Sequence, residues 1–462
     1  VEMGLVRLYR ITGKADYLNL AKFFIDQRGH ATYNAKSKNE WENGKYFQDD
    51  EPVIDQDEAE GHAVRAMYLY SGMADVAALT GDKAYLAAID RIWDNMVSKK
   101  MYVQGSIGAV GDGERFGDNY QLPNATAYNE TCAAIGSVFW NERMFLLHGD
   151  AKYIDVLGKT LYNGLISGVG LDGKSFFYTN AMQIKNGFSY ADTEPVRSGW
   201  FECSCCPTNI VRLIPSIPGY VYAPPGRAVS VHLFIRGTGN LVVNGKPVKI
   251  IQQNNYPWDG GLLFTVKTAS ATEMNLKIRI PGWARNEAIP SDLYGYLKPM
   301  ESKVTIKVNG KPVNYELKNG YAVISKKWKA NDRVEVNLPM EVRRVVANYK
   351  VKDDNGKLAL QRGPIIYCAE WADNNGHAAN FIIPENAVFK PEYNASLLNG
   401  ITVLKGDVKQ VNIDADGQNI NTENKQLVLI PYYAWANRGK GEMMVWFPSQ
   451  VKNIDLLTSL GN

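Results

Sequence analysis

Leu79-Thr80-Gly81, followed by Tyr85-Leu86, is one copy of a signature that occurs three times in the first half of the chain. The other copies are Ile11-Thr12-Gly13 with Tyr17-Leu18 and Leu147-His148-Gly149 with Tyr153-Ile154, so the glycines recur every 68 residues. A glycine after an apolar periodic run is typical of a left-handed helix C-terminus, and apolar spacing resumes directly after it. Each copy therefore predicts a helix, a tight turn and a second helix, and the chain begins with stacked α-hairpins.

Two polar residues occupy equivalent positions of this repeat. His62 and Glu130 are also 68 residues apart, and each lies where the first helix of its copy is expected to begin. Residues at one register of stacked helices share one surface, so we expect both side chains on the same face. The alternative is that they are solvated helix starts, with the carboxylate complementing the helix dipole.

The cysteines indicate a metal site. Three of the five lie in Glu202-Cys203-Ser204-Cys205-Cys206-Pro207, where adjacent cysteines are poorly placed to bridge each other, and a large core needs no disulfide. Thiolates suit zinc, and Glu130-Thr131-Cys132 supplies a further thiolate and a carboxylate. The candidate four-coordinate zinc ligands are therefore Glu130, Cys132, Cys205 and Cys206, with buried free thiols as the alternative. Cys203 is left outside the set, and Cys368, in an apolar strand-like run, is expected in a core.

Composition excludes two classes of partner. Lys and Arg number 51 against 48 Asp and Glu, which leaves a net charge of +3 and no basic stripe for nucleic acid. No apolar run approaches the roughly 20 residues of a membrane span. A chain of 462 residues exceeds one ordinary core, so two or three domains are expected.

The hydrophobic period changes from helical to alternating after residue 224. Segments such as Val229–Ile235, Leu276–Ile280 and Val334–Leu338 alternate apolar and polar residues, and Asn309-Gly310 and Asn319-Gly320 provide hairpin turns between such segments. Short strands at this spacing indicate a β-sandwich. We therefore predict a helical domain over residues 1–224, a β-sandwich over 225–345 and a second β-sandwich over 346–462.

Several motifs together carry a family resemblance. They are Glu58-Ala59-Glu60-Gly61-His62-Ala63-Val64-Arg65, Glu114-Arg115-Phe116, Glu130-Thr131-Cys132, Cys203-Ser204-Cys205-Cys206-Pro207-Thr208-Asn209 and Leu360-Gln361-Arg362-Gly363-Pro364. Over nearly its whole length the chain resembles glycoside hydrolase family 127, the β-L-arabinofuranosidase family. The resemblance implies a multidomain α plus β protein, with an (α/α)6-barrel catalytic domain followed by β-sandwich domains. Six hairpins close such a barrel and this sequence shows about three, so we expect the N-terminal half of the barrel to be absent from it.

The resemblance also implies roles for individual residues. Cys205 would be the nucleophile, Glu114 the general acid/base, and Glu130, Cys132, Cys205 and Cys206 the ligands of Zn²⁺. His62 and Tyr178 match family positions that contact the sugar. Three thiolates and a carboxylate around one dication leave a negative site, which we expect to raise the pKa of a nearby Glu114 toward the range useful for a general acid.

The expected function is a zinc-dependent retaining exo-glycosidase that releases β-linked L-arabinofuranose from plant-derived glycans. Two alternatives remain at this level: the same fold and mechanism acting on another plant-polysaccharide sugar, or a non-catalytic carbohydrate-binding protein with a structural zinc. The expected partner is an oligosaccharide or glycan, without nucleic acid or membrane, and a homo-oligomer is left open. Periplasmic and cytoplasmic locations are both compatible with the sequence, the periplasm being slightly favoured.

Overall fold

The computed structural model describes residues 1–185, 195–224, 226–413 and 420–453. Within them the repeat forms the predicted α-hairpins, and the first helix of each copy ends at its signature glycine. Gly13, Gly81 and Gly149 have φ angles of 69°, 72° and 66°, the left-handed conformation that favours glycine. The paired helices are α1 (Glu2–Thr12) with α2 (Ala15–Asp26), α4 (Ala63–Thr80) with α5 (Lys83–Asn95), and α6 (Thr131–His148) with α7 (Ala151–Thr160).

Helices α4 and α6 form the buried centre of this helical region. Gly136 on α6 lets the two helices approach, because a Cβ at this residue would lie 2.7 Å from Cβ of Met67 on α4. The second helices, α5 and α7, are amphipathic and begin at Asp82 and Asp150, whose carboxylates accept backbone N–H groups of the first turn. The starts of α4 and α6 are thereby held next to each other.

Short elements complete the helical region. Helix α8 begins at Cys205, so Pro207 lies inside the first turn, where its missing N–H costs nothing. Helix α8 packs against α6. These elements are α3 (Glu40–Asn43), η1 (Lys45–Phe47), η2 (Met96–Lys100), η3 (Asp112–Glu114), η4 (Leu161–Leu165), η5 (Ile166–Gly168), α8 (Cys205–Leu213) and η6 (Ile214–Tyr220).

The middle region consists of two sheets, antiparallel except for one parallel pair, that share one core. One sheet has the strand order β10-β9-β13-β6-β5-β4 and the other β11-β12-β7-β3-β2, with β3 and β7 parallel. Alternate residues of β13 are buried, and side chains of both sheets, including Phe264 and Leu276, meet in the same hydrophobic cluster. The strands are β2 (Tyr222–Ala223), β3 (Ala228–Val231), β4 (Gly237–Val243), β5 (Lys246–Asn254), β6 (Gly261–Thr268), β7 (Thr272–Arg279), β9 (Thr305–Val308), β10 (Lys311–Pro312), β11 (Glu316–Lys318), β12 (Tyr321–Trp328) and β13 (Asp332–Asn337).

The C-terminal region is built on a sheet with the order β17-β19-β20-β16-β15-β14-β8. The predicted domain boundary between residues 345 and 346 falls inside β14, which pairs with β15. Cys368 is fully buried in β16, as expected. The strands are β8 (Tyr294–Tyr296), β14 (Val342–Ala347), β15 (Lys357–Arg362), β16 (Ile365–Glu370), β17 (Phe381–Ile382), β18 (Phe389–Asn394), β19 (Ile401–Ile413), β20 (Ile420–Pro431), β21 (Met443–Met444) and β22 (Phe447–Pro448).

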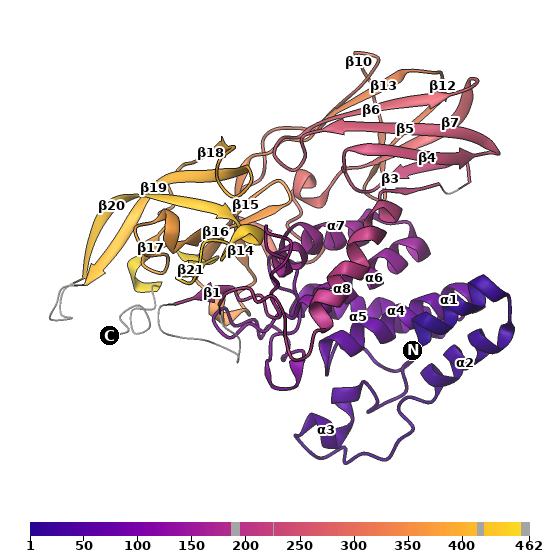
Figure 1. Cartoon of the computed structure of the whole chain (residues 1–462), viewed down its shortest axis with the longest axis horizontal. Coiled ribbons are helices and arrows are strands. Elements are labelled where there is room, and N and C mark those ends of the chain that lie inside the picture. Colours follow the sequence, from indigo (N-terminus) through magenta and orange to yellow (C-terminus); the bar gives the residue numbers. More distant parts are fainter. Residues whose placement is uncertain (186–194, 225, 414–419, 454–462) are drawn as a thin grey trace.

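Both β regions pack against the helical region (Figure 1). Asp155 on α7 accepts hydrogen bonds from Arg279 at 2.5 Å and from Arg285 at 2.9 Å, both in the middle region. Strand β1 (Gln183–Ile184) joins the C-terminal sheet through β21. The two residues of β1 are therefore paired with the C-terminal region. No helix among the described residues has the length and apolar character needed to cross a membrane.

Candidate active site

Three helix starts meet at one point of the helical region. His62 and Glu130 are the N-cap residues of α4 and α6, which confirms that they occupy equivalent positions of the repeat. Cys132 lies in the first turn of α6, and Cys205 and Cys206 are the first residues of α8. Backbone N–H groups and the helix dipole favour negative charge at such starts. The site therefore joins segments that are far apart in the sequence.

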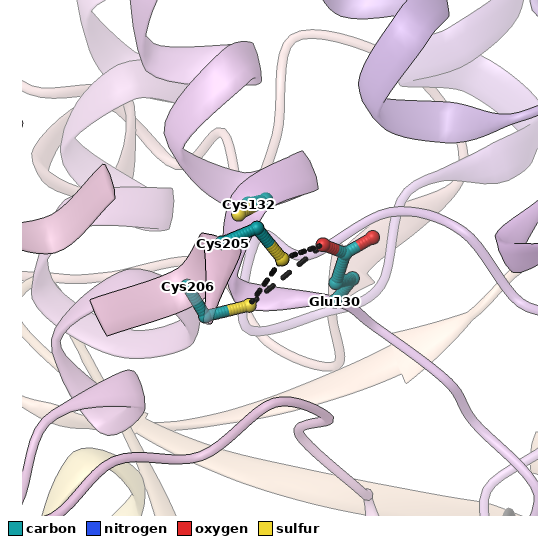
Figure 2. Close-up of side chains that lie close together, drawn as sticks. All are labelled: Glu130, Cys132, Cys205 and Cys206. Carbon is teal, nitrogen blue, oxygen red and sulfur yellow. Dashed lines mark hydrogen bonds between the residues drawn. The ribbon is translucent and has the colours of Figure 1, made fainter. Parts of the chain in front are cut away.

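Glu130, Cys132, Cys205 and Cys206 form one compact group (Figure 2), in which the four ligand atoms all lie within 4.8 Å of one another. Sγ of Cys205 lies 3.5 Å from Oε1 of Glu130, and Sγ of Cys206 lies 3.7 Å from the same oxygen. The two sulfur atoms are 3.7 Å apart, so they are free thiols rather than a disulfide. This is the set that the sequence predicts, and Cys203, which is exposed, lies outside it.

The chemistry of this donor set fits a soft divalent cation. Glu130 is only 3% exposed, and burial raises the pKa of its carboxyl well above the usual range. Among the described residues, Oε2 of Glu130 has no hydrogen-bond partner. A buried carboxylate next to three thiols and with an unpaired oxygen needs a compensating positive charge. Zinc bound by sulfur and carboxylate oxygen would supply that charge.

The three thiols are not equivalent. Hydrogen bonds from the thiols of Cys132 and Cys206 lower the pKa of Cys205, whereas burial raises the pKa of Cys206. The pKa of Cys132 is also raised, chiefly by its hydrogen bond to Cys205. Cys205 is half-buried, while the other two thiols are buried. Cys205 is therefore the thiol whose ionised form its neighbours favour, and it is the most accessible of the three.

Glu114 lies beside this group, in the loop that contains η3. Its Oε1 accepts hydrogen bonds from the hydroxyl groups of Tyr128 at 2.8 Å and Tyr178 at 3.1 Å. Its Oε2 lies 3.1 Å from Nε2 of His62. The φ angle of Glu114 is 53°, an uncommon conformation for a residue with a side chain. The carboxylate is thus held by three side chains that approach from different segments.

Tyr178 connects the two predicted catalytic residues. Its hydroxyl lies 3.3 Å from Sγ of Cys205 and also donates to Glu114. Its backbone oxygen accepts the N–H of Thr131, at the start of α6. One hydroxyl group therefore contacts both the sulfur atom and the carboxylate. The predicted nucleophile and the predicted acid/base are thus neighbours in one site.

One expectation about Glu114 is wrong. We expected the negative cluster to raise its pKa, but the hydrogen bond from His62 holds the pKa of Glu114 below its usual value, aided by those from Tyr128 and Tyr178. Hydrogen bonds made directly to a carboxylate outweigh the charges of groups that do not touch it. The structure therefore favours the ionised form of Glu114 before a substrate binds.

Sequence reasoning missed Tyr128. A tyrosine two residues before a helix N-cap gives no local signal, because its role depends on where Glu114 lies. The segments that carry the two tyrosines are joined by paired amides, since Nδ2 of Asn129 donates to the backbone oxygen of Asn180 and Nδ2 of Asn180 donates back to that of Asn129. Asn129 adopts a φ angle of 48°, a conformation that asparagine tolerates.

Comparison with known proteins agrees with this arrangement. Residues 1–219 match the model of the GH127 catalytic domain of β-L-arabinofuranosidase, residues 228–340 the GH127 middle domain and residues 342–448 the glycoside hydrolase family 127 C-terminal domain. The chain is 37% identical to the non-reducing end β-L-arabinofuranosidase of Bifidobacterium longum subsp. longum, an alignment that spans 96% of this chain and 70% of that protein.

The chain belongs to glycoside hydrolase family 127.

Solved structures of this family superpose closely on the chain. A GH127 β-arabinofuranosidase matches with a TM-score of 0.92 and 48% identity, over 98% of this chain and 69% of its own. A GH127 β-L-arabinofuranosidase from Geobacillus stearothermophilus T6 matches with a TM-score of 0.88 and 39% identity, over 97% and 71%. The family 127 chain is therefore a glycoside hydrolase with a catalytic, a middle and a C-terminal domain.

Proposed function

We propose that this family 127 enzyme is a zinc-dependent retaining exo-glycosidase that releases β-linked L-arabinofuranose from the non-reducing ends of plant-derived glycans. The observation that carries the proposal is the contact of one hydroxyl group, that of Tyr178, with both Cys205 and Glu114. A retaining glycosidase needs an attacking group and a proton donor beside the same glycosidic bond. The choice of β-L-arabinofuranose as the released sugar comes from the relatives, which are named β-L-arabinofuranosidases.

In the first step the sulfur of Cys205 attacks the anomeric carbon while the bond to the leaving oxygen breaks. Glu114 gives its proton to that oxygen, and the sugar is left bonded to the sulfur. Because the pKa of Glu114 is lowered, the carboxyl group must take up this proton before it can act as an acid. His62, which lies 3.1 Å from Oε2, and Tyr178 are placed to contact the sugar between these two groups.

In the second step the ionised Glu114 removes a proton from a water molecule that attacks the same carbon. The carbon–sulfur bond breaks, and the thiolate of Cys205 is restored. The hydrogen bonds that lower the pKa of Glu114 favour this ionised form and so assist the second step. Two displacements at one carbon leave its configuration unchanged.

We assign Glu130, Cys132, Cys205 and Cys206 as the residues that would hold the zinc ion. When bound, zinc keeps thiols deprotonated at neutral pH and offsets the charge of the buried carboxylate. Cys206 and Cys132 are buried, so they serve as ligands only, whereas half-buried Cys205 remains within reach of a substrate.

We further propose that the α-hairpins belong to an (α/α)6 barrel and that each β region is a β-sandwich. The shared glycine signature and the central placement of α4 and α6 support the first part. The sheets of the middle region that share one core support the second. The predicted domains are residues 1–224, 225–345 and 346–462, and the pairing of β14 with β15 places residues 342–345 with the last of them. Residues 186–194, 225, 414–419 and 454–462 lie outside the described part of the chain.

A screen with p-nitrophenyl α- and β-L-arabinofuranosides tests the function. We expect hydrolysis of the β anomer alone, and proton NMR of the first product should show the β anomer before mutarotation. Release of the α anomer first would contradict the cysteine mechanism. If the protein hydrolyses another glycoside and neither arabinofuranoside, it is still a glycoside hydrolase, but the proposed sugar is wrong.

A further inference from the structure

Trp41 lies on a small aromatic platform beside the loop of Glu114. Its ring stacks on that of Tyr46, with centroids 4.3 Å apart and an interplanar angle of 20°. Tyr46 in turn meets the ring of His62 edge-on at 5.8 Å, and the guanidinium of Arg65 lies 5.2 Å from its centroid. Tyr46 is therefore fixed among its neighbours, whereas Trp41 remains 37% exposed.

The short helix that carries Trp41 is attached to both neighbours of Glu114. A Cβ at Gly113 would lie 2.6 Å from the ring of Trp41, so ring and backbone are in close contact. Oε1 of Glu40 accepts a hydrogen bond of 2.8 Å from Arg115. The side chain of Asn39 accepts the N–H of Trp41 and caps this helix. These contacts place Trp41 at a defined position relative to the proposed acid/base.

The proposed reaction indicates which part of a substrate would lie near Trp41. The released sugar bonds to Cys205, so it lies between that sulfur atom and Glu114. The hydroxyl of Tyr178 contacts both of these groups. The proton of Glu114 goes to the oxygen of the leaving group. His62, which is assigned to the released sugar, lies at the other carboxylate oxygen and meets the ring of Tyr46 edge-on. Trp41 is linked to His62 through the ring of Tyr46, one ring further out than the groups assigned to the released sugar, so the leaving group is the part of the substrate left for it to contact.

We propose that Trp41, supported by Tyr46, binds the first sugar of the leaving group by stacking against its ring. The proposal rests on the proposed function, since it takes Glu114 as the acid/base. A flat aromatic surface buries the apolar C–H face of a sugar and leaves its hydroxyl groups in water. Trp41 then determines the preference for a glycan over a small alcohol as leaving group, and plays no part in the chemistry at the anomeric carbon.

The test compares two substrates on matched variants. The substrates are methyl β-L-arabinofuranoside and a disaccharide with the same β-L-arabinofuranose at its non-reducing end. Trp41→Leu retains apolar packing against Gly113 but loses the flat ring, and Trp41→Phe retains a flat ring. For Trp41→Leu we expect kcat/KM on the disaccharide to fall about tenfold, the effect of losing one stacked ring, with the methyl glycoside changed less than about twofold.

Trp41→Phe should keep most of the activity on the disaccharide. Tyr349→Ala, which removes a ring that is 76% exposed and lies in the C-terminal region, should leave both substrates unaffected. An equal loss on both substrates in Trp41→Leu, or no loss on either, would overturn this inference alone. If the unaltered protein hydrolyses neither substrate, the proposed function fails, and the inference fails with it.

Discussion

The starts of α4 and α6 occupy the same position of the repeat but serve different chemistry. His62 is the N-cap residue of α4, is partly accessible and contacts Glu114, whereas Glu130 is the N-cap residue of α6, is buried and lies against the thiols of α8. The backbone position is equivalent in both, so the difference comes from what packs against each helix start. A repeat thus places polar groups on one face, and the neighbouring segments decide whether such a group lies against thiols or against a carboxylate.

The largest expected effect lies on the thiol side of this comparison. Cys205→Ser should lower kcat by about 10³-fold or more. Cys205 and Glu114 act as one catalytic unit, so the loss of either removes most of the catalytic effect of both. Serine also lacks the readily ionised sulfur that attacks the sugar. The matched control is Cys203→Ser, two residues away and exposed, which should retain full activity. Near-normal turnover of the Cys205→Ser protein would remove Cys205 from the mechanism.

Metal removal should act on the start of α6 and leave that of α4 intact. Elemental analysis should find one zinc per chain, retained in Cys203→Ser and lost in Cys206→Ser. A loss of about 2 kcal/mol would lower the melting temperature of a domain of about 200 residues by roughly 4 to 8 °C. Calorimetry with and without a chelator measures this, and re-addition of zinc should reverse it. An unchanged melting temperature together with no bound metal would refute the proposed ligand set.

On the α4 side, Glu114→Gln should affect poor leaving groups most. General acid catalysis contributes about 10² to 10⁴-fold, so hydrolysis of a disaccharide should slow by that order. An activated aryl leaving group needs no proton, so the first step should be nearly normal and a burst of aryl alcohol should precede slow turnover. Azide, which replaces water without needing a base, should restore the second step. Equal loss on both substrates from the first turnover would argue against the acid/base role.

The smallest expected effect concerns the pKa of Glu114. Its hydrogen-bond donors lower this pKa, so Tyr128→Phe, which removes one of them, should raise it. Because the first step needs protonated Glu114, the alkaline limb of kcat/KM against pH should move to higher pH, while the maximum changes only a few-fold. His62→Asn should move the limb in the same direction and further, since His62 is the main cause of the shift. If the alkaline limb does not move in either variant, it reports the titration of a group other than Glu114.

Much of the fold could be predicted because local interactions determine it. The glycines at 13, 81 and 149 end helices through their own backbone freedom, and the alternation of β13 follows from one buried face. The members of the compact group were also predictable as two pairs, since Glu130 and Cys132, like Cys205 and Cys206, are neighbours in sequence. The boundary near β14 could not be placed from the sequence, because the pairing of β14 with β15 determines it.

The sequence by itself determined the helical repeat and the change to strands, because each depends on residues close together in the chain. It also supplied the pairs Glu130 with Cys132 and Cys205 with Cys206, but the meeting of these two pairs depends on the packing of α8 against α6. Only the tertiary structure decided the environment of Glu114. Tyr128 and Tyr178 are 14 and 64 residues away from it, and both donate to the same carboxylate oxygen. The pKa of Glu114 depends on how many donors reach that carboxylate, and no local pattern encodes such a count. The direction of its shift was therefore decided by packing.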